Sequence, residues 1–169
     1  VVWISEIMLQ QTVMKVVLPR YESFLERYPN ILALGAATTE QLQLAVRGLG
    51  YYRRFRMLHQ AVKQLSEGVQ QLEDVSWPTS RAQWQELPGV GPYVSAALAS
   101  ITLGESVAVV DGNVERVMAR LLDLQLAVND KGLKKNVQSV AEQVVSSKRA
   151  GDFNQALMEL GQRICTPLS

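Results

Sequence analysis

The chain has 169 residues, of which 47% are hydrophobic and 20% are charged, and its formal net charge is +1. This composition is typical of a globular protein and excludes a disordered or fibrous one, and the length suffices for one large or two small domains. No apolar run approaches the roughly 18 to 20 residues that a membrane-spanning helix needs. A net charge this close to zero does not by itself indicate a nucleic-acid partner.

The N-terminus and the single cysteine bear on where the protein works. The first nine residues, VVWISEIML, have no basic segment and no small-residue cleavage site, so they do not resemble a signal peptide. They begin inside an apolar pattern without a methionine, and we therefore expect that the chain has been cut at this end. The lone Cys165 excludes an internal disulfide and suits a reducing compartment.

Apolar residues recur at helical spacing along the chain, and no alternation of period two is longer than the VAVV run at residues 107–110. Proline, glycine and capping residues divide the chain into about nine to eleven helices, which makes the predicted fold class all-α. The expected helices are Val2–Val17, which Pro19 ends, then Tyr21–Tyr28, Ile31–Ala37, Thr39–Val46, Arg53–Glu67, one from a Thr79 or Ser80 cap to Glu86, Pro92–Leu103, Gly112–Leu122, Lys131–Val145 and Asp152–Cys165.

Residues 87–111, LPGVGPYVSAALASITLGESVAVVD, predict a helix, a tight hairpin and a second helix. Pro88 ends the preceding helix, and Pro92 suits the first turn of the next. Gly89 and Gly91 lack a Cβ, so the backbone there can take a positive φ or approach another surface closely. The unpaired N–H groups at the start of the second helix suit an anion such as phosphate, but an ordinary turn between core helices fits equally well.

Two carboxylates are candidates for chemistry. Glu6 lies on an apolar helix face, where a glutamate is more often paired or edge-exposed than catalytic, although desolvation would raise its pKa and make it a general acid near neutral pH. Asp111 directly precedes GNVERV and suits the N-cap of that helix, where backbone N–H groups favour the charged form. One protonated and one charged carboxylate form the pair that cleaves a glycosidic bond.

A basic and aromatic segment lies between residues 46 and 66. It has five positive side chains and no acidic one, with three aromatic residues interleaved: Arg47, Arg53, Arg54, Arg56 and Lys63, and Tyr51, Tyr52 and Phe55. A solvated basic helix face explains this pattern. A surface that grips a nucleic-acid backbone and props open a distorted duplex explains it as well.

Five segments, in order along the chain, together resemble one family. WISEIMLQQT, GLGYYRRFRMLH, LPGVGPYVSAAL, VAVVDGNVERVMAR and FNQALMELGQRIC resemble the adenine DNA glycosylases of the MutY type, within the helix-hairpin-helix superfamily of base-excision enzymes. LPGVG alone is weak, whereas SEIMLQQT with GLGYY and VDGNV is specific. The resemblance implies two helical lobes with the active site in the cleft between them. A six-helix lobe would span about residues 15–125, with the hairpin motif at 80–103, and residues 1–14 and 126–169 would form a second, incomplete lobe.

The resemblance also implies roles for single residues. Glu6 would protonate a flipped adenine, Asp111 would stabilise the cationic sugar, Asn113 would hold the sugar and water, and Tyr93 would lie beside the same centre. A base inside a duplex cannot be reached, so DNA contacts must offset its unstacking. The residues implied to enter or flank the base stack are Leu9, Gln10, Gln11 and Tyr51, and those implied to meet phosphates are Arg53, Arg54, Gly89, Val90 and Gly91.

Tyr93 narrows the implied chemistry. Superfamily members that also nick the strand have a lysine nucleophile at this position, and a tyrosine, with a pKa of about 10, cannot form the Schiff base that lysine forms. The resemblance therefore implies a monofunctional glycosylase acting on adenine opposite 8-oxoguanine or guanine. Two alternatives stay open: a thymine-mismatch glycosylase of the same superfamily, and a non-catalytic helix-hairpin-helix module that only binds DNA.

The resemblance extends to a cofactor and a partner. Family members usually hold a 4Fe–4S cluster with four cysteines, and Cys165 matches the first of them, but one thiolate cannot hold the cluster. We expect a truncated sequence, since ICTPLS resembles the family's lead-in, and the family's first helix and C-terminal domain are missing as well. The expected partner of this monomer is double-stranded DNA with A:8-oxoguanine or A:G mispairs, in a bacterial cytoplasm at the nucleoid or in a eukaryotic nucleus, without a membrane.

Overall fold

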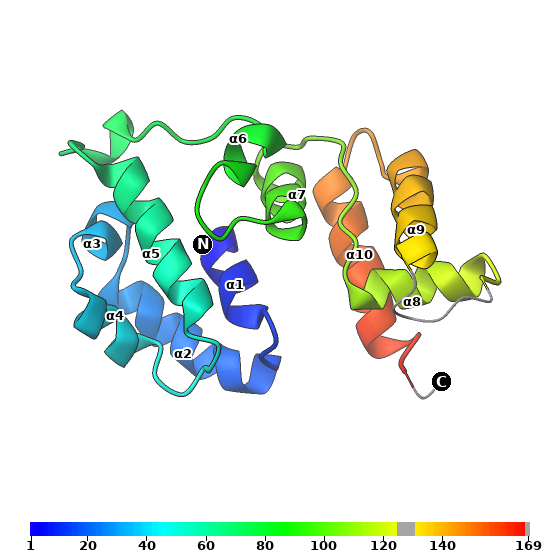
Figure 1. Cartoon of the computed structure of the whole chain (residues 1–169), viewed down its shortest axis with the longest axis horizontal. Helices are drawn as coiled ribbons and strands as arrows, with labels where there is room; N and C mark the ends of the chain where they lie inside the picture. Colours follow the sequence, from blue (N-terminus) through cyan, green and yellow to red (C-terminus); the bar gives the residue numbers. More distant parts are fainter. Residues whose placement is uncertain (125–130, 168–169) are drawn as a thin grey trace. The chain divides into compact units, whose positions relative to one another are not determined.

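The computed structural model of the protein describes residues 1–124 and 131–167 (Figure 1). In these residues the secondary structure is helical without a strand, which confirms the predicted all-α class. None of the described helices is long and apolar enough to cross a membrane. The α-helices are α1 (Val2–Leu9), α2 (Met14–Arg27), α3 (Ile31–Gly35), α4 (Thr39–Ala45), α5 (Arg53–Ser66), α6 (Arg81–Gln85), α7 (Pro92–Thr102), α8 (Gly112–Leu121), α9 (Lys131–Val144) and α10 (Ala150–Arg163), and the 3-10 helix η1 is Leu72–Asp74.

The chain divides into two compact units, which we call unit 1 and unit 2. Unit 1 comprises Val1–Thr79 and Gln83–Val94, and unit 2 comprises Ser80–Ala82 and the chain from Ser95 onward. This division differs from the expected lobes. Helix α1 packs against α2 and α5, so the N-terminal residues belong with unit 1, and α8 packs against α9 and α10 in unit 2. The expected cleft between two lobes stays a prediction.

The first expected helix is two helices in the structure. Helix α1 ends at Leu9, and Gln11 has a left-handed φ of 54°, which interrupts the helical backbone. Helix α2 then continues through Pro19, where the sequence analysis placed a helix end. A proline inside a helix forfeits a hydrogen bond. Burial of Val17 and Phe24 on α2, which packs on α1 and α4, offsets that loss.

Helix α5 is the central element of unit 1 and packs against α1 and α3. Its apolar face is almost fully enclosed: Phe55, Leu58, Ala61 and Val62 are each at most 2% exposed. The same helix buries His59, which is 5% exposed and whose Nε2 has no hydrogen-bond partner among the described residues. Since α5 begins directly after the GLGYY loop, its burial fixes the position of that loop.

Unit 2 is built around α8, which packs against α9 and α10. Its buried core contains apolar residues of α8 and α9, namely Val114, Met118, Leu133, Val137 and Ala141, and the partly buried Leu157 and Met158 of α10 pack against it. The VAVV run has no regular secondary structure, and the side chain of Asn154 on α10 bonds to its backbone. The Asn154 side chain accepts from the Val109 N–H at 3.1 Å and donates to the Val107 carbonyl at 2.9 Å. A single buried amide thus pairs with the segment that leads to Asp111.

The burial of His59, the chain's only histidine, predicts a pH dependence. Burial first, and the charge of Lys63 second, lower the pKa of His59 from its ordinary value near 6.5. As the pH falls through about 6.5, the unfolded chain takes up a proton that the folded chain does not, so the free energy of unfolding decreases. In an NMR titration the single histidine C2 proton should have a midpoint below 6.5. A midpoint at or above that value contradicts this prediction.

Candidate active site

Unit 1 brings Glu6 and Tyr93 together, although 87 residues separate them in the chain. Glu6 lies on α1, and Tyr93 lies in the first turn of α7. The Tyr93 hydroxyl donates a hydrogen bond to Glu6 Oε2 at 3.0 Å, and both side chains are partly buried. Ile7 and Met8, at 1% and 0% exposure, anchor α1 in the core beside Glu6. Two of the four candidate catalytic residues are therefore in direct contact.

The turn between α6 and α7 confirms the predicted hairpin. Its two glycines differ in how tightly the surrounding structure constrains them. Gly89 has a φ of 77°, and a Cβ there would lie 2.5 Å from the Met57 Cβ on α5, so only glycine fits. A Cβ on Gly91 would meet nothing within 4 Å. Val90 is buried, and its N–H donates to the Leu87 carbonyl at 3.1 Å. The Val90 N–H was expected to face a DNA phosphate. In the structure it is already hydrogen-bonded inside the turn.

Asp111 is the N-cap of α8, as the sequence predicts. Its Oδ1 accepts from the N–H groups of Asn113 at 2.9 Å and Val114 at 2.8 Å. Its Oδ2 accepts from the Asn113 side-chain amide at 2.8 Å. Three donors thus fix the carboxylate of Asp111, and the two candidate catalytic residues of unit 2 are hydrogen-bonded to each other.

Arg116 extends this arrangement to the end of α10. One of its nitrogens, Nη2, donates to Asn113 Oδ1 at 2.9 Å and to the Gly161 carbonyl at 2.7 Å, and Nε donates to the Cys165 carbonyl at 2.7 Å. A Cβ on Gly161 would lie 2.6 Å from the Asn113 Cβ, so α10 approaches α8 closely at this point. No motif or spacing in the sequence predicted these contacts of Arg116 and Gly161. The only local signal was the three-residue spacing of Asn113 and Arg116 on one helix.

A groove of about 470 Å³ lies between the end of α1 and the start of α5. Its lining includes six of the nine residues expected to contact DNA: Gln10, Gln11, Tyr51, Arg53, Arg54 and Gly89. Gln11 and Tyr51 are exposed and have left-handed φ values of 54° and 44°, which are unusual for residues other than glycine. Leu9 is partly buried and does not line this groove.

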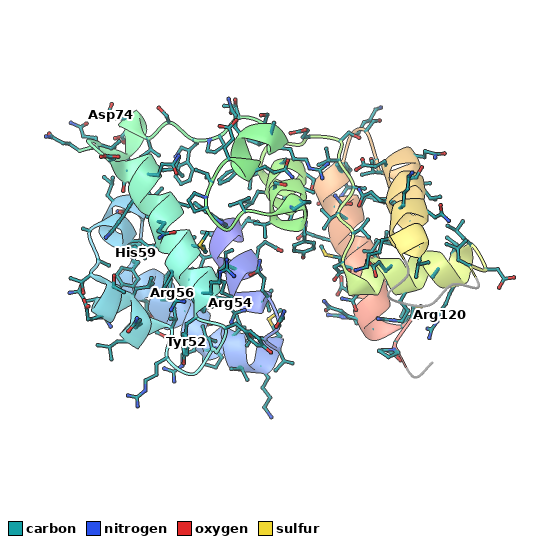
Figure 2. All side chains as sticks on the ribbon, in the orientation of Figure 1. Tyr52, Arg54, Arg56, His59, Asp74 and Arg120 are labelled. Atoms are coloured by element: carbon teal, nitrogen blue, oxygen red, sulfur yellow. The ribbon has the colours of Figure 1, made fainter. Side chains whose placement is uncertain are left out.

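The two adjacent arginines of this groove differ in environment. Arg53 is exposed, whereas Arg54, which is labelled in Figure 2, is 8% exposed. The Arg54 guanidinium donates to the carbonyls of Met8, Gln10 and Leu49. Burial lowers the pKa of Arg54, and the surrounding carbonyl oxygens partly replace the lost water. Arg54 was expected to contact a DNA phosphate. In the structure its guanidinium is instead hydrogen-bonded to carbonyl groups inside unit 1.

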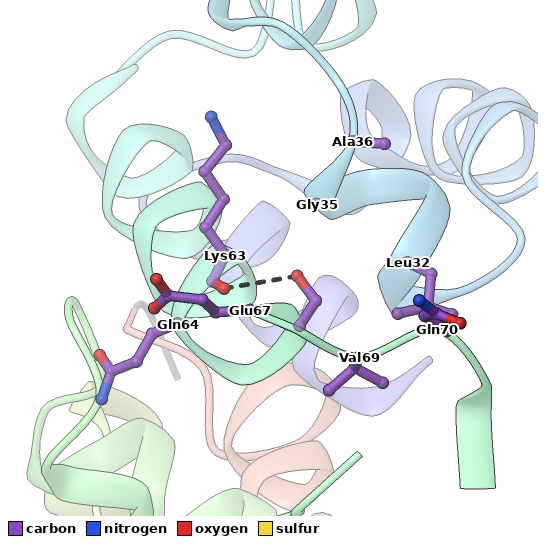
Figure 3. Close-up of a pocket in the computed structure, with 9 residues that line it drawn as sticks. Leu32, Gly35, Ala36, Lys63, Gln64, Glu67, Val69 and Gln70 are labelled. Atoms are coloured by element: carbon purple, nitrogen blue, oxygen red, sulfur yellow. Dashed lines mark hydrogen bonds between the residues drawn. The ribbon is translucent and has the colours of Figure 1, made fainter. Parts of the chain in front are cut away.

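A second depression of unit 1, of about 770 Å³, lies beside α3 and the end of α5 (Figure 3). Its lining is Leu32, Gly35, Ala36, Lys63, Gln64, Ser66, Glu67, Val69 and Gln70. None of the candidate catalytic or DNA-binding residues is among them. Its one positive and one negative side chain are both exposed, so it offers no enclosed polar group for chemistry.

Cys165 does not form a metal site with its neighbours. The thiol is free and partly buried, and Arg120 Nη1 lies 3.2 Å from its Sγ. In the part of the chain that the structure describes, no three His, Cys, Asp or Glu side chains are grouped so that they could hold a metal ion. A 4Fe–4S cluster needs four protein ligands, usually cysteines, and the sequence contains one cysteine, so these residues alone do not fit the cluster.

Comparison with known families matches most of the chain. Residues 4–147 match the model of the HhH-GPD superfamily base excision DNA repair proteins. This match covers both the α1 segment with Glu6 and the α8 segment with Asp111. The chain belongs to the HhH-GPD superfamily of base excision DNA repair proteins.

Curated relatives are named adenine DNA glycosylase. The human protein is 39% identical over 98% of this chain and 30% of its own length, and the Arabidopsis thaliana protein is 38% identical over 98% and 28%. The protein of Buchnera aphidicola subsp. Schizaphis graminum (strain Sg) is 34% identical over 98% and 47%. The chain therefore spans less than half the length of each of these relatives.

Solved structures support the fold. A thermostable thymine-DNA glycosylase has a TM-score of 0.81 and 26% identity, over 98% of this chain and 75% of its own. Endonuclease III in a non-covalent DNA complex also has a TM-score of 0.81, over 99% and 75%, but at 21% identity this likeness concerns the fold alone. Both likenesses agree with the helix-hairpin-helix fold that the sequence predicts.

The close approach at Gly161 predicts that Gly161→Ala displaces Asn113 and destabilises unit 2. The added methyl group must push α10 from α8, and overpacking of this kind costs about 1–3 kcal/mol. Gly112→Ala is the matched control, because a Cβ there meets nothing within 4 Å. Denaturant unfolding of both variants measures the difference. Equal stability of the two variants contradicts the prediction.

Proposed function

We propose that the protein is a monofunctional adenine DNA glycosylase that hydrolyses the N-glycosidic bond of adenine mispaired with 8-oxoguanine or guanine. Identities of 34–39% to proteins named adenine DNA glycosylase support the substrate. The observation that carries the proposal is the hydrogen bond between Tyr93 and Glu6. It orients a partly buried carboxyl group on an otherwise apolar helix, which is the geometry that a general acid needs.

In the proposed reaction Glu6 protonates a ring nitrogen of the extruded adenine, so that the base departs as a neutral molecule. The bond to the sugar breaks with positive charge developing on the sugar ring. Asp111, fixed by its three donors, supplies the negative charge that stabilises this cation. Asn113 holds the sugar and the water that completes hydrolysis. Two carboxylates with different roles are the usual means of cleaving a glycosidic bond.

The proposed partner is double-stranded DNA with an A:8-oxoguanine or A:G mispair, bound by a monomer. The groove between Gln11 and Tyr51, with the exposed Arg53 on its wall, is the surface we assign to DNA. Cys165 would be one of the four cysteine ligands of a 4Fe–4S cluster. These 169 residues contain no other cysteine. The proposed location is the bacterial cytoplasm at the nucleoid, or the nucleus if the source is a eukaryote.

A thymine-mismatch glycosylase is the second candidate, because a thymine-DNA glycosylase is among the similar solved structures, at 26% identity. The higher identity to the adenine enzymes favours adenine. Release of adenine from an A:8-oxoguanine duplex and of thymine from a matched T:G duplex, both measured at single turnover, distinguishes the two. Thymine release without adenine release refutes our first proposal.

Glu6→Gln should abolish adenine release and leave duplex binding intact. Loss of a general acid costs about 10²- to 10⁴-fold in rate, and glutamine keeps the shape of the side chain without its proton. Single-turnover base release and equilibrium binding measure the two properties. Glu26→Gln, an exposed position on α2, is the control. If Glu6→Gln releases adenine at the parent rate, Glu6 is not the general acid. A parent protein that binds the duplex and releases no base indicates a binding-only module.

Tyr93 predicts the absence of strand-nicking chemistry. A phenol that donates to Glu6 provides no amine, so it cannot form the imine with the sugar that borohydride reduces. Treatment of the protein and its DNA substrate with borohydride should give no covalent protein–DNA product above background. A superfamily enzyme with a lysine nucleophile, treated in parallel, should be trapped. Strong trapping of the present protein contradicts the monofunctional assignment.

A further inference from the structure

Arg54 makes a connected set of internal hydrogen bonds at the edge of the groove. Its Nη1 donates to the Met8 carbonyl at 3.1 Å and also to the Gln10 carbonyl. Its Nη2 donates to Thr12 Oγ1 at 2.7 Å and to the Leu49 carbonyl at 3.0 Å. One planar guanidinium therefore connects the end of α1 to the loop that precedes α5.

Thr12 closes the same set of bonds. Its hydroxyl lies 3.2 Å from the Leu49 carbonyl and 3.3 Å from the Gln10 carbonyl, besides accepting from Arg54. The side chains of Arg54 and Thr12 thus each lie within hydrogen-bond distance of both the Gln10 and the Leu49 carbonyl. Lysine cannot replace arginine here, because a single ammonium group lacks the rigid fork that serves acceptors on two sides.

The two segments that Arg54 connects each carry a strained, exposed residue. Gln11 follows Gln10 directly, and Tyr51 lies two residues after Leu49. Both have left-handed φ values, and Tyr51 is 63% exposed. Such backbone strain costs about 1–3 kcal/mol a residue and persists only where surrounding bonds impose it. Arg54 supplies those bonds on both sides of the groove.

We propose that Arg54 is the positioning residue that fixes Gln11 and Tyr51 at the separation needed to unstack a base from duplex DNA. This assignment rests on the proposed function. Arg54 touches no phosphate in this role, since its guanidinium is enclosed by carbonyls and Thr12. Its effect on the reaction passes through the backbone of the two segments. The exposed Arg53 next to it remains the candidate for a phosphate contact.

The test compares Arg54→Lys with the parent protein on two duplexes. In the first, adenine lies opposite 8-oxoguanine, and in the second it lies opposite an abasic-site analogue, where no base pair has to be broken. A 2-aminopurine beside the adenine reports unstacking by its fluorescence, independently of base release. Arg54→Lys should lose the fluorescence rise and slow release from the first duplex about tenfold or more, and from the second less than about threefold.

Two further variants guard against a general folding defect. Thr12→Val removes the hydroxyl that accepts from Arg54 and should shift both signals in the same direction by a smaller factor. Thr12→Ser keeps the hydroxyl and should restore the parent values. Arg27→Ala, which removes an exposed arginine at the end of α2, should change neither signal. Circular dichroism confirms that each variant is folded.

The outcomes separate this inference from the proposed function. An equal slowing on both duplexes, or no change in Arg54→Lys, overturns the positioning role while the glycosylase activity of the parent stands. A parent protein that unstacks the base without releasing it refutes the proposed function. Loss of that unstacking signal in Arg54→Lys would then still support the positioning role. A parent protein that neither unstacks nor releases adenine overturns both.

Discussion

The polar groups at helix ends are the constraint on which this structure depends. Every α-helix leaves four N–H groups and four carbonyls without partners inside the helix. The described α-helices have only 5 to 14 residues, so a large part of the backbone lies at such ends. Side chains that satisfy these groups therefore determine where the helices begin, end and meet. Two of the candidate site residues, Asp111 and Arg54, belong to this set.

Three examples show how the same side chain serves the fold and the site. Asp111 satisfies the first N–H groups of α8, and this capping bond is what orients its carboxylate. Arg54 takes carbonyls at the end of α1, and Arg116 takes the Gly161 carbonyl at the end of α10. A capping residue can thus also be a candidate functional residue, so a structural explanation for its position does not argue against a chemical role.

Local patterns predicted much of the fold and part of the candidate site. Periodicity and capping residues located most helices to within a few residues, and Asp111 was predicted as an N-cap because capping depends on neighbours in the sequence. Pro19 was misjudged because tertiary burial of α2 overrides its local cost. No local pattern in the sequence predicts that Arg54 is buried and Arg53 exposed. Gly161 is constrained by its contact with Asn113, which lies 48 positions earlier in the chain. Long-range contacts of this kind cannot be read from spacing.

Asn154 illustrates how narrowly the second carboxylate is supported. The segment before Asp111 has no neighbouring strand in the described residues. The Asn154 amide provides an acceptor and a donor to it, and Glu142 Oε2 accepts from the Ala108 N–H at 3.2 Å. Exchanging this amide for the isosteric carboxylate would set two oxygens against each other in a place with 1% exposure. A homologous sequence that retains Asp111 and Asn113 can therefore still lose the position of the segment that leads to them.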